Sequence, residues 1–423
     1  LVVSPTGSDT AAGTRDEPLA TLGKAVAIAE PGDTCVLLPG VYRRKTVIDR
    51  SGEADRPIRI VAEGEVLLDG TDPVEGDWET HEGSILKIRL PGPAVEQAFR
   101  DGVPLSPARW PNATFRETWI RSTWAKGARG SKKDLMICPE LAGTGIDWTG
   151  AVAVLNVGHQ YKTWTREILS HGAGKEQFTY ELAERLGDGR DDGPSWWNDR
   201  FYITGTIKAL DAPGEFHHDA EAGWFYCVTK DGQPPEPGSI GVKRRDYAIQ
   251  GRKIHDIQVS GFKVFGCTIR FDASERIVVD KCNIRFPAFS TWIGETLPRG
   301  HKQRLPTPVT SVGGVDNVIR GCTVAYTCGA GIEMAGHRNR VEDCIVHDVC
   351  WSGTINFAGI TIRDQGRKDR VSASAISRCT VYNAGNIGIQ HRGKSNLVEH
   401  NAVHHTGLAL SLIHISEPTR PTT

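Results

Sequence analysis

The sequence predicts an all-β fold, a parallel β-helix in which successive turns of the chain stack as a solenoid. The first observation is a short pattern that returns between residues 254 and 406, each time around one small or flat residue. These anchors are Phe262, Cys282, Cys322, Cys344, Cys379 and Asn401. The second observation is their spacing of 20, 40, 22, 35 and 22 residues, in which the longer gaps are a turn plus a loop. A period of about 22, with β-branched runs and Gly or Asn corners, is typical of a parallel β-helix.

The anchors predict a continuous column inside the coil, because each turn buries one side chain about 4.8 Å from the next. Cysteine serves in such a column as a compact apolar side chain. Cys328 and Cys350 each follow an anchor by six residues and predict a second column. The ten cysteines show no CxxC or Cys/His spacing of a zinc site. Reduced, stacked thiols explain the spacing, and disulfides between neighbouring turns are the alternative.

The composition and charge of the chain limit the classes of partner that it is expected to bind. The chain has 423 residues, a formal net charge of -1 and a pI near 7.0, so we expect neither nucleic acid nor a membrane as partner. A solenoid can use such a length as one unit. No apolar run approaches the roughly 18 residues that cross a bilayer. The sequence begins at Leu1 without a methionine or an apolar leader, so we expect any export signal to be absent from it.

Residues 1–75 are expected to form an N-terminal cap and the first turns of the helix. Residues 23–30 predict a short amphipathic helix with Thr21 as its cap. Residues 31–42 and 57–64 each predict a strand and a turn. A helix over the open end covers the unpaired backbone and apolar cross-section of the first turn.

This order resembles the start of the secreted right-handed parallel β-helix proteins of the pectate-lyase-like superfamily. Residues 76–250 interrupt the rhythm, hold nine of the 11 tryptophans and predict a β-rich insertion. Within it, residues 109–112, 198–202 and 209–215 resemble segments of bacterial carbohydrate-active β-helix proteins near glycoside hydrolase families 120 and 141. The resemblance implies a secreted or periplasmic bacterial protein with a polysaccharide or oligosaccharide substrate. These motifs identify the scaffold better than the substrate.

Residues 251–408 are expected to carry the helix turns with the groove, and residues 409–423 break their pattern. The last residues, from about 410, have neither coil rhythm nor a capping helix. They resemble translated sequencing-adapter read-through at the end of a metagenomic gene fragment. We therefore expect a non-native tail, with a disordered native tail as the alternative, and a last turn that is left uncovered.

The candidate site is the outward face beside a column of inward isoleucines, because side chains of successive turns gather there. The turns align on Ile269, Ile293, Ile332, Ile360 and Ile389. This alignment places in the outward row Arg270, Gly294, Glu333, Thr361 and Gln390. The ionisable residues around the row are Asp272, Glu295, His337, Arg363, Asp364, His391 and Arg392. So many charges on adjacent turns are costly to assemble without a polar ligand.

Glycoside hydrolysis needs two carboxyl groups, about 5 Å apart for retention or about 6.5–9.5 Å apart for inversion. Neighbouring turns about 4.8 Å apart and alternate turns about 9.6 Å apart can supply either spacing. The candidate catalytic pairs join Glu333 to Asp364 or Glu295 on adjacent turns, or to Asp272 two turns away. Glu333 is favoured because it follows the tight Gly-rich segment 329–332. Taken singly, each carboxylate is equally well explained as a solvated or ion-paired surface residue.

Sugar contacts are expected from the charged residues Arg270, His337, Arg363, His391 and Arg392, and from the aromatic residues Trp196, Trp197 and Trp292. Core packing of the insertion is the alternative for the tryptophan pair. His217 and His218, and also His400 and His404, are interpreted as surface or loop histidines rather than metal ligands.

A hydrolase of this kind needs no cofactor. The alternative is a polysaccharide lyase, in which an Arg or His base removes the C5 proton of a uronate and Asp272 with Asp364 holds calcium. A third possibility is a non-catalytic glycan-binding solenoid. The fold alone does not decide among the three.

Overall fold

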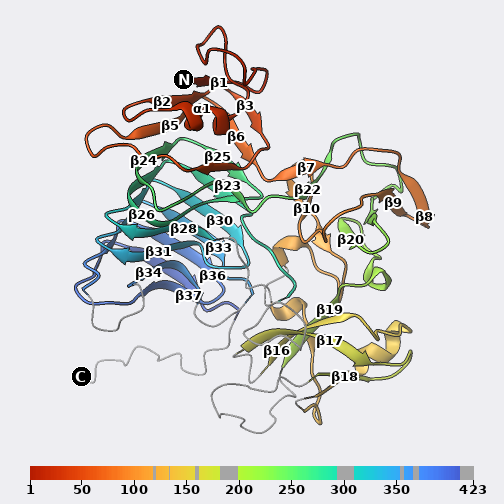
Figure 1. Cartoon of the computed structure of the whole chain (residues 1–423). Coiled ribbons are helices and arrows are strands. Elements are labelled where there is room, and N and C mark those ends of the chain that lie inside the picture. Colours follow the sequence, from red (N-terminus) through yellow and green to blue (C-terminus); the bar gives the residue numbers. More distant parts are fainter. Residues whose placement is uncertain are drawn as a thin grey trace, which may run out of the picture.

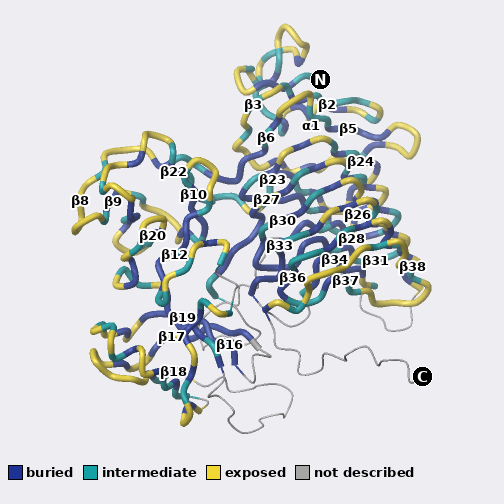
Figure 2. The backbone as a smooth tube through the Cα atoms, turned by 180° about the vertical axis from the view of Figure 1, so that it is seen from behind, coloured by how far each residue is buried: buried dark blue, intermediate teal, exposed yellow. Residues whose placement is uncertain are grey.

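The computed structural model confirms the parallel β-helix and describes residues 1–117, 121–132, 134–157, 162–181, 199–292, 309–352, 357–364 and 371–409. The turns stack along one side of the molecule, and the chain between β6 and β23 folds beside them (Figure 1). Buried residues follow the strands of the stack, whereas exposed residues gather at the turns and at the outer edges (Figure 2). No described helix is long and apolar enough to cross a membrane.

The strands of the stack form three parallel faces. Face 1 contains β4 (Thr46–Ile48), β23 (Tyr247–Arg252), the first half of β26 (Thr268–Asp280), β28 (Thr310–Val315), β31 (Ile332–His337), β34 (Ala358–Arg363) and β37 (Ile387–His391). Face 2 contains β1 (Val2–Val3), β2 (Thr34–Leu37), β5 (Ile58–Ala62), β24 (His255–Ser260), the second half of β26, β29 (Val318–Arg320), β32 (Arg340–Glu342), β35 (Ala375–Ser377) and β38 (Leu397–Glu399). Face 3 contains β3 (Gly40–Tyr42), β6 (Val66–Asp69), β25 (Lys263–Phe265), β27 (Asn283–Arg285), β30 (Thr323–Thr327), β33 (Ile345–Val349), β36 (Thr380–Ala384) and β39 (Ala402–Thr406).

The insertion, residues 71–243, leaves the helix at the corner between face 3 and face 1. Its first sheet contains β7 (Thr71–Pro73), β10 (Ala98–Arg100), β11 (Val103–Pro104) and β22 (Ile240–Lys243). Its second contains β8 (Glu79–Glu82), β9 (Ile85–Arg89), β12 (Ser106–Pro107), β20 (Glu215–Asp219) and β21 (Trp224–Val228). Its third contains β13 (Arg109–Trp110), β14 (Ala125–Lys126), β15 (Leu135–Ile137), β16 (Val152–Val157), β17 (Lys162–Ser170), β18 (Gln177–Tyr180) and β19 (Arg200–Thr204). Short 3-10 helices cover Phe115–Glu117, Arg121–Thr123, Pro139–Thr144 and Ile207–Ala209.

The helix at the N-terminal end of the stack is α1 (Leu22–Ile28), which confirms the predicted cap. Thr21 begins it as predicted, since its hydroxyl accepts the backbone N–H of Lys24 at 3.1 Å. Leu22, Ala25 and Val26 are buried against the first turn. This apolar side therefore covers the end of the core, as an otherwise open coil requires.

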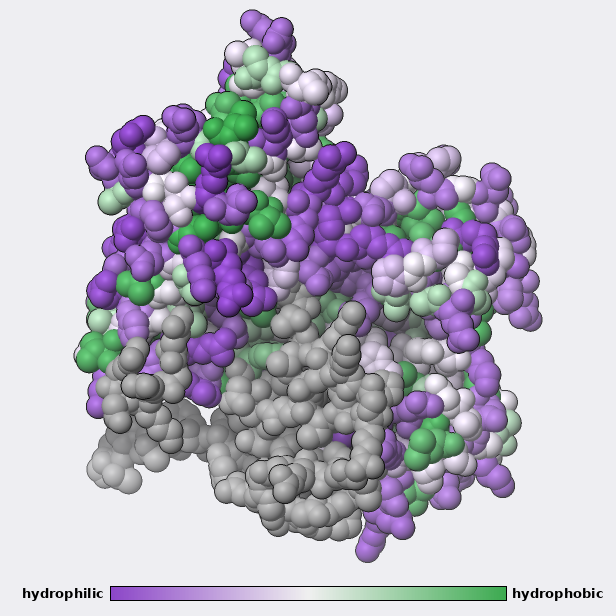
Figure 3. Space-filling model, in the orientation of Figure 1, coloured by the Kyte–Doolittle hydropathy of each residue, from purple (hydrophilic) through white to green (hydrophobic). Residues whose placement is uncertain are grey.

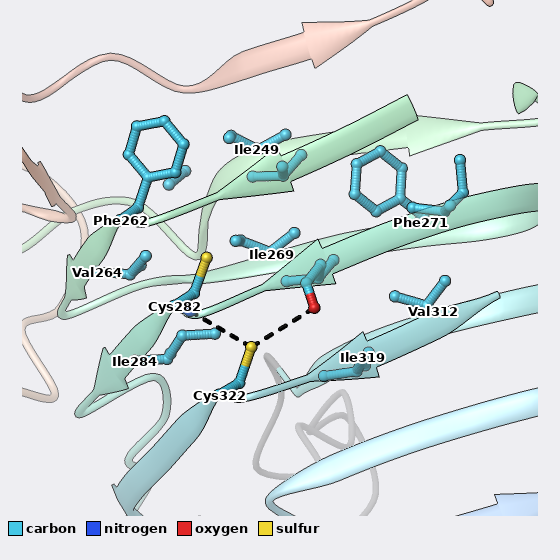
Figure 4. Packing of buried hydrophobic residues seen from close by; sticks show 14 of the residues in the cluster. Ile249, Phe262, Val264, Ile269, Phe271, Cys282, Ile284, Val312, Ile319 and Cys322 are labelled. Atoms are coloured by element: carbon cyan, nitrogen blue, oxygen red, sulfur yellow. Dashed lines mark hydrogen bonds between the residues drawn. The ribbon is translucent and has the colours of Figure 1, made fainter. Parts of the chain in front are cut away.

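The predicted cysteine column lies in register inside the stack. Figure 4 shows Phe262, Cys282 and Cys322 one above another, and the Cys282 N–H donates to the Cys322 sulfur at 3.4 Å. The column ends on Asn401, whose side-chain oxygen accepts the Cys379 N–H at 2.8 Å. All ten cysteines are buried free thiols, so the structure contains the stacked thiols and not the alternative disulfides.

A ladder of polar side chains that the sequence analysis did not predict occupies the corner between faces 1 and 2. Asn317 accepts the Ile277 N–H at 2.9 Å, and Asn339 accepts the Asn317 N–H at 3.1 Å. Ser374 then accepts the Asn339 N–H at 3.1 Å. Each side chain thus satisfies a backbone donor of the neighbouring turn, which a buried corner cannot leave unpaired.

Candidate functional site

The outward row on face 1 contains four of the five predicted residues and differs from the prediction at one position. Strand pairing places side by side Gln250, Arg270, Ser311, Glu333, Thr361 and Gln390. Ser311, beside the inward Thr310, takes the place that was predicted for Gly294 beside Ile293. Ile293, Gly294 and the candidate Glu295 lie outside the described residues. Within the described chain, β26 pairs directly with β28, so Ser311 is the neighbour of Arg270 in this row.

Two ion pairs stand on this face. The Arg270 Nε donates to Asp272 at 2.7 Å, and the same guanidinium donates to the Tyr247 hydroxyl at 3.1 Å. Two turns further along, Arg363 pairs with Glu333 at 3.2 Å, and the Glu333 side chain is 22% exposed. We call Arg270, Asp272, Glu333 and Arg363 the face 1 site.

Small residues separate the two ion pairs of the face 1 site. Gly313 pairs in register with Ala335 and Ala335 with Arg363, in a row beside Ser311, whereas the pairing of β26 with β28 is interrupted at Asp272 and Ala273. A methyl group built on Gly313 would meet its nearest atom, the Ala335 oxygen, at 3.6 Å, so the floor has room at this point. The arrangement presents charged groups at both ends of a low floor, which suits a chain of sugar units lying along the helix axis.

Asp364 is not brought together with Glu333. It follows β34, which ends at Arg363, and the residue of that strand that pairs with Glu333 is Thr361. One of its carboxylate oxygens is buried and has no hydrogen-bond partner in the described part of the chain.

The calcium site suggested for a lyase is also not formed by these two carboxylates. The register places Asp272 and Asp364 three turns apart, about 14 Å, whereas calcium holds its oxygen ligands at about 2.3–2.6 Å. Among the described residues, no group of three or more His, Cys, Asp or Glu side chains could hold a metal ion.

The two histidines predicted to flank the groove differ. His337 lies on the outward side of β31, and its Nδ1 contacts the Val371 carbonyl oxygen at 3.0 Å. His391 is in register with the buried Ile362, but its own side chain is exposed at the end of β37. Its contact with a substrate stays a prediction. The next residue, Arg392, is exposed, and its N–H donates to the Ile362 oxygen at 2.8 Å.

The predicted aromatic contacts lie elsewhere. Trp196 and Trp197 fall outside the described residues. Trp292 lines a cavity of about 480 Å³ where the insertion meets the connection that follows β27, and not the face 1 site. His217 and His218 line the same cavity from strand β20, so they are half-buried strand residues and not the surface or loop histidines that were predicted.

Two residues of the site were missed at the sequence level. Ser311 was overlooked although 310–315 alternates buried and half-buried positions, which is the pattern of a strand with one covered face. Tyr247 begins β23 directly after the insertion, where no earlier repeat was available to set the phase.

Seen from the side of Figure 3, the surface where the stack meets the upper insertion is mainly hydrophilic.

Comparison with known proteins supports the fold. No protein-family model matches the chain, and no curated protein matches it. A solved structure described as a glycoside hydrolase aligns with a TM-score of 0.53 and 16% identity, over 95% of this chain and 96% of that chain. XylC in its complex with xylose aligns with a TM-score of 0.50 and 14% identity, over 95% of this chain and 62% of that chain. The likeness is one of fold. It confirms the resemblance to carbohydrate-active β-helix proteins at that level, and membership near families 120 and 141 stays a prediction.

Proposed function

We propose that this protein is a carbohydrate-active enzyme, a glycoside hydrolase that cleaves a plant or algal polysaccharide at the face 1 site. The observation that carries the proposal is the pair of carboxylates, Asp272 and Glu333, on one outer face across a floor of small residues. The two solved structures with the higher TM-scores support the same class, since one is described as a glycoside hydrolase and the other holds xylose. A secreted or periplasmic setting is part of the proposal, because polysaccharides lie outside the cell.

The spacing of the two carboxylates favours inversion over retention. Asp272 stands two turns, about 9.6 Å, from Ala335, which is two residues from Glu333 on the same strand. The two residues along the strand add about 6.6 Å, so the backbone positions of Asp272 and Glu333 are roughly 12 Å apart, which is far from the roughly 5 Å of retention and leaves room for both a sugar and a water molecule. In an inverting reaction, one carboxyl group protonates the leaving oxygen and the other removes a proton from the attacking water.

The second candidate is a polysaccharide lyase. It is favoured by the arginines on this face, Arg270, Arg363 and Arg392, which would neutralise the carboxylate of a uronate. Arg270 and Arg363 already hold carboxylates of the protein itself. A uronate would have to compete with those partners, so hydrolysis is the better-supported reaction.

A polysaccharide panel that includes uronate polymers separates the two reactions. Reducing ends released without new ultraviolet absorbance support hydrolysis. Absorbance from a C4–C5 double bond would replace the hydrolase with a lyase. Binding without either signal would leave a glycan-binding solenoid.

Glu333→Gln should lower turnover by about 10²–10⁴-fold, the usual contribution of a general acid or base, while the melting temperature stays near that of the wild type. Glu342→Gln is the matched control. Glu342 pairs with Arg340 at 3.5 Å on face 2 and is 19% exposed, against 22% for Glu333. Full activity in Glu333→Gln would remove this residue from the mechanism.

A further inference from the structure

The cavity beside Trp292 is built by both parts of the molecule. Thr291 and Trp292 line it from the connection that leaves face 3, and Glu96, Thr204 and His217 line it from the insertion. Its volume of about 480 Å³ lies within the range of about 300–1,000 Å³ that small-molecule sites occupy. None of the face 1 residues belongs to its lining.

The wall on the helix side is fixed by hydrogen bonds to the insertion. The buried Ser290 hydroxyl donates to a Glu96 carboxylate oxygen at 3.1 Å and accepts the Trp292 N–H at 3.2 Å. The Thr165 hydroxyl donates to the Thr291 carbonyl oxygen at 2.6 Å. Trp292 and Glu96 are therefore held at set positions on opposite sides of one joint, as a preorganised binding site requires.

The two neighbouring histidines have different tasks. The His218 Nδ1 accepts the Val95 N–H at 3.1 Å, so its Nε2 carries the proton and donates to the Leu90 oxygen at 2.9 Å. His218 thereby fastens the segment 90–95 to strand β20. His217 has no hydrogen bond to any described residue, although it is half-buried and lines the cavity. Its ring offers one donor and one acceptor, because burial lowers the pKa of His217 to about 4 and keeps it neutral.

The chemistry of the lining identifies the kind of ligand. Thr204 and Thr291 carry hydroxyl groups, Glu96 carries an acceptor and Trp292 carries an aromatic face. Among the residues that the structure describes, the lining includes no lysine or arginine, so it favours an uncharged ligand over an anionic one. The buried ammonium of Lys243, which pairs with Asp246 at 3.8 Å, lies near Glu96 but is not part of the described lining.

We propose that this cavity binds one uncharged pyranose unit, as a carbohydrate subsite of its own between the insertion and the helix. A pyranose presents hydroxyl groups that both donate and accept, and also an apolar C–H face that stacks on an aromatic ring. The proposal goes beyond the function proposed above and does not depend on Glu333.

Equilibrium binding tests it, with D-xylose and D-galactose as neutral probes and D-glucuronate as the anionic one, by calorimetry or ligand-observed NMR. We expect saturable binding of at least one neutral sugar, and at least tenfold weaker binding of glucuronate. His217→Phe and Trp292→Ala should each weaken binding at least tenfold. His81→Phe is the control, since His81 is an exposed residue of β8 that also contacts the Tyr226 ring, at 5.1 Å, but does not line the cavity.

The variants separate this site from face 1. Glu333→Gln should bind the sugar as the wild type does, and loss of binding there would place the sugar on face 1 and overturn the proposal. Unchanged binding in both His217→Phe and Trp292→Ala, or no saturable binding of either neutral sugar, would overturn it as well. If His217→Phe lowers the melting temperature, His217→Gln supplies the test, because it keeps a polar group of similar reach. If no neutral sugar binds in the cavity but Glu333→Gln is inactive, the proposed subsite is refuted and the proposed function at face 1 is retained.

Discussion

Replacing Glu215 with glutamine should change how the stability of the fold depends on pH. Glu215 begins strand β20, is 2% exposed and accepts the backbone N–H groups of Arg109, Asp211 and Ala212 at 3.2–3.3 Å. Burial raises the pKa of Glu215 to about 7, although these three hydrogen bonds work in the opposite direction. The folded chain therefore holds a proton that the unfolded chain has already released.

The sign and the size follow from that difference. Stability from this proton is fully present below pH 4.5, the ordinary pKa, and is lost as the pH rises toward 7. The difference, 7 − 4.5 = 2.5 units, corresponds to roughly 3 kcal/mol at about 1.36 kcal/mol per unit. Glutamine stays neutral throughout, so the variant lacks this loss. Subtracting the wild type from the variant cancels the other titrating groups.

Thermal unfolding at pH 4.5 and pH 7.5 measures the effect. An unfolding entropy of about 2.1 cal/mol/K per residue gives about 0.9 kcal/mol/K for a chain of this length, so roughly 3 kcal/mol corresponds to about 3 °C. The melting temperature of Glu215→Gln relative to the wild type should rise by that amount between the two pH values. A constant or falling difference would refute the reasoning. It would mean that the Arg109 guanidinium, which donates to the Pro111 oxygen at 2.8 Å, offsets the burial of the carboxylate.

Three further predictions concern the coil. In the native protein at pH 8 the ten buried cysteines should resist a thiol reagent, because burial raises thiol pKa values such as those of Cys267 and Cys328 to about 12. In denaturant without a reductant all ten should react. Fewer than ten reactive thiols would reveal a disulfide. Asn339→Ala should cost about 2–5 kcal/mol by leaving the Asn317 N–H and the Gly314 oxygen unpaired. Asn383→Ala, at a half-exposed position of β36, should cost less than about 1 kcal/mol, and equal melting temperatures of the two variants would contradict the ladder. Gly314→Ala should prevent folding, since its Cβ would lie 1.9 Å from the Ser274 oxygen. Gly313→Ala should fold normally and lower activity, because the added methyl group narrows the floor of the face 1 site. Unimpaired activity in Gly313→Ala would argue against a substrate on that floor.

The parts of the fold that repeat were predictable from sequence, and the parts that occur once were not. The column from Cys282 to Cys379 follows from spacing alone, because identical positions of a coil stack whatever lies between them. Ser311 could not be placed from the repeats, because the 40 residues between the anchors Cys282 and Cys322 exceed one period. His391 is exposed although it stands in register with the buried Ile362, and spacing does not reveal such a difference at the end of a strand. The cavity beside Trp292 joins segments nearly 200 residues apart, and no local pattern encodes such a meeting.

One corner of the coil links the two proposed sites. The insertion leaves face 3 after β6, and the connection with Ser290 and Trp292 leaves face 3 after β27. Both segments lie where the chain goes from face 3 to face 1. Glu333 stands near the start of β31 at the same passage, and its charge adds to the rise that burial gives to the pKa of the Cys350 thiol. A glycan reaching from the charged floor toward the insertion would therefore meet a neutral pocket next. If both proposed sites bind sugar, we expect this order of charged and uncharged surfaces to favour a substrate by the sequence of its units, which a single groove of uniform charge could not do.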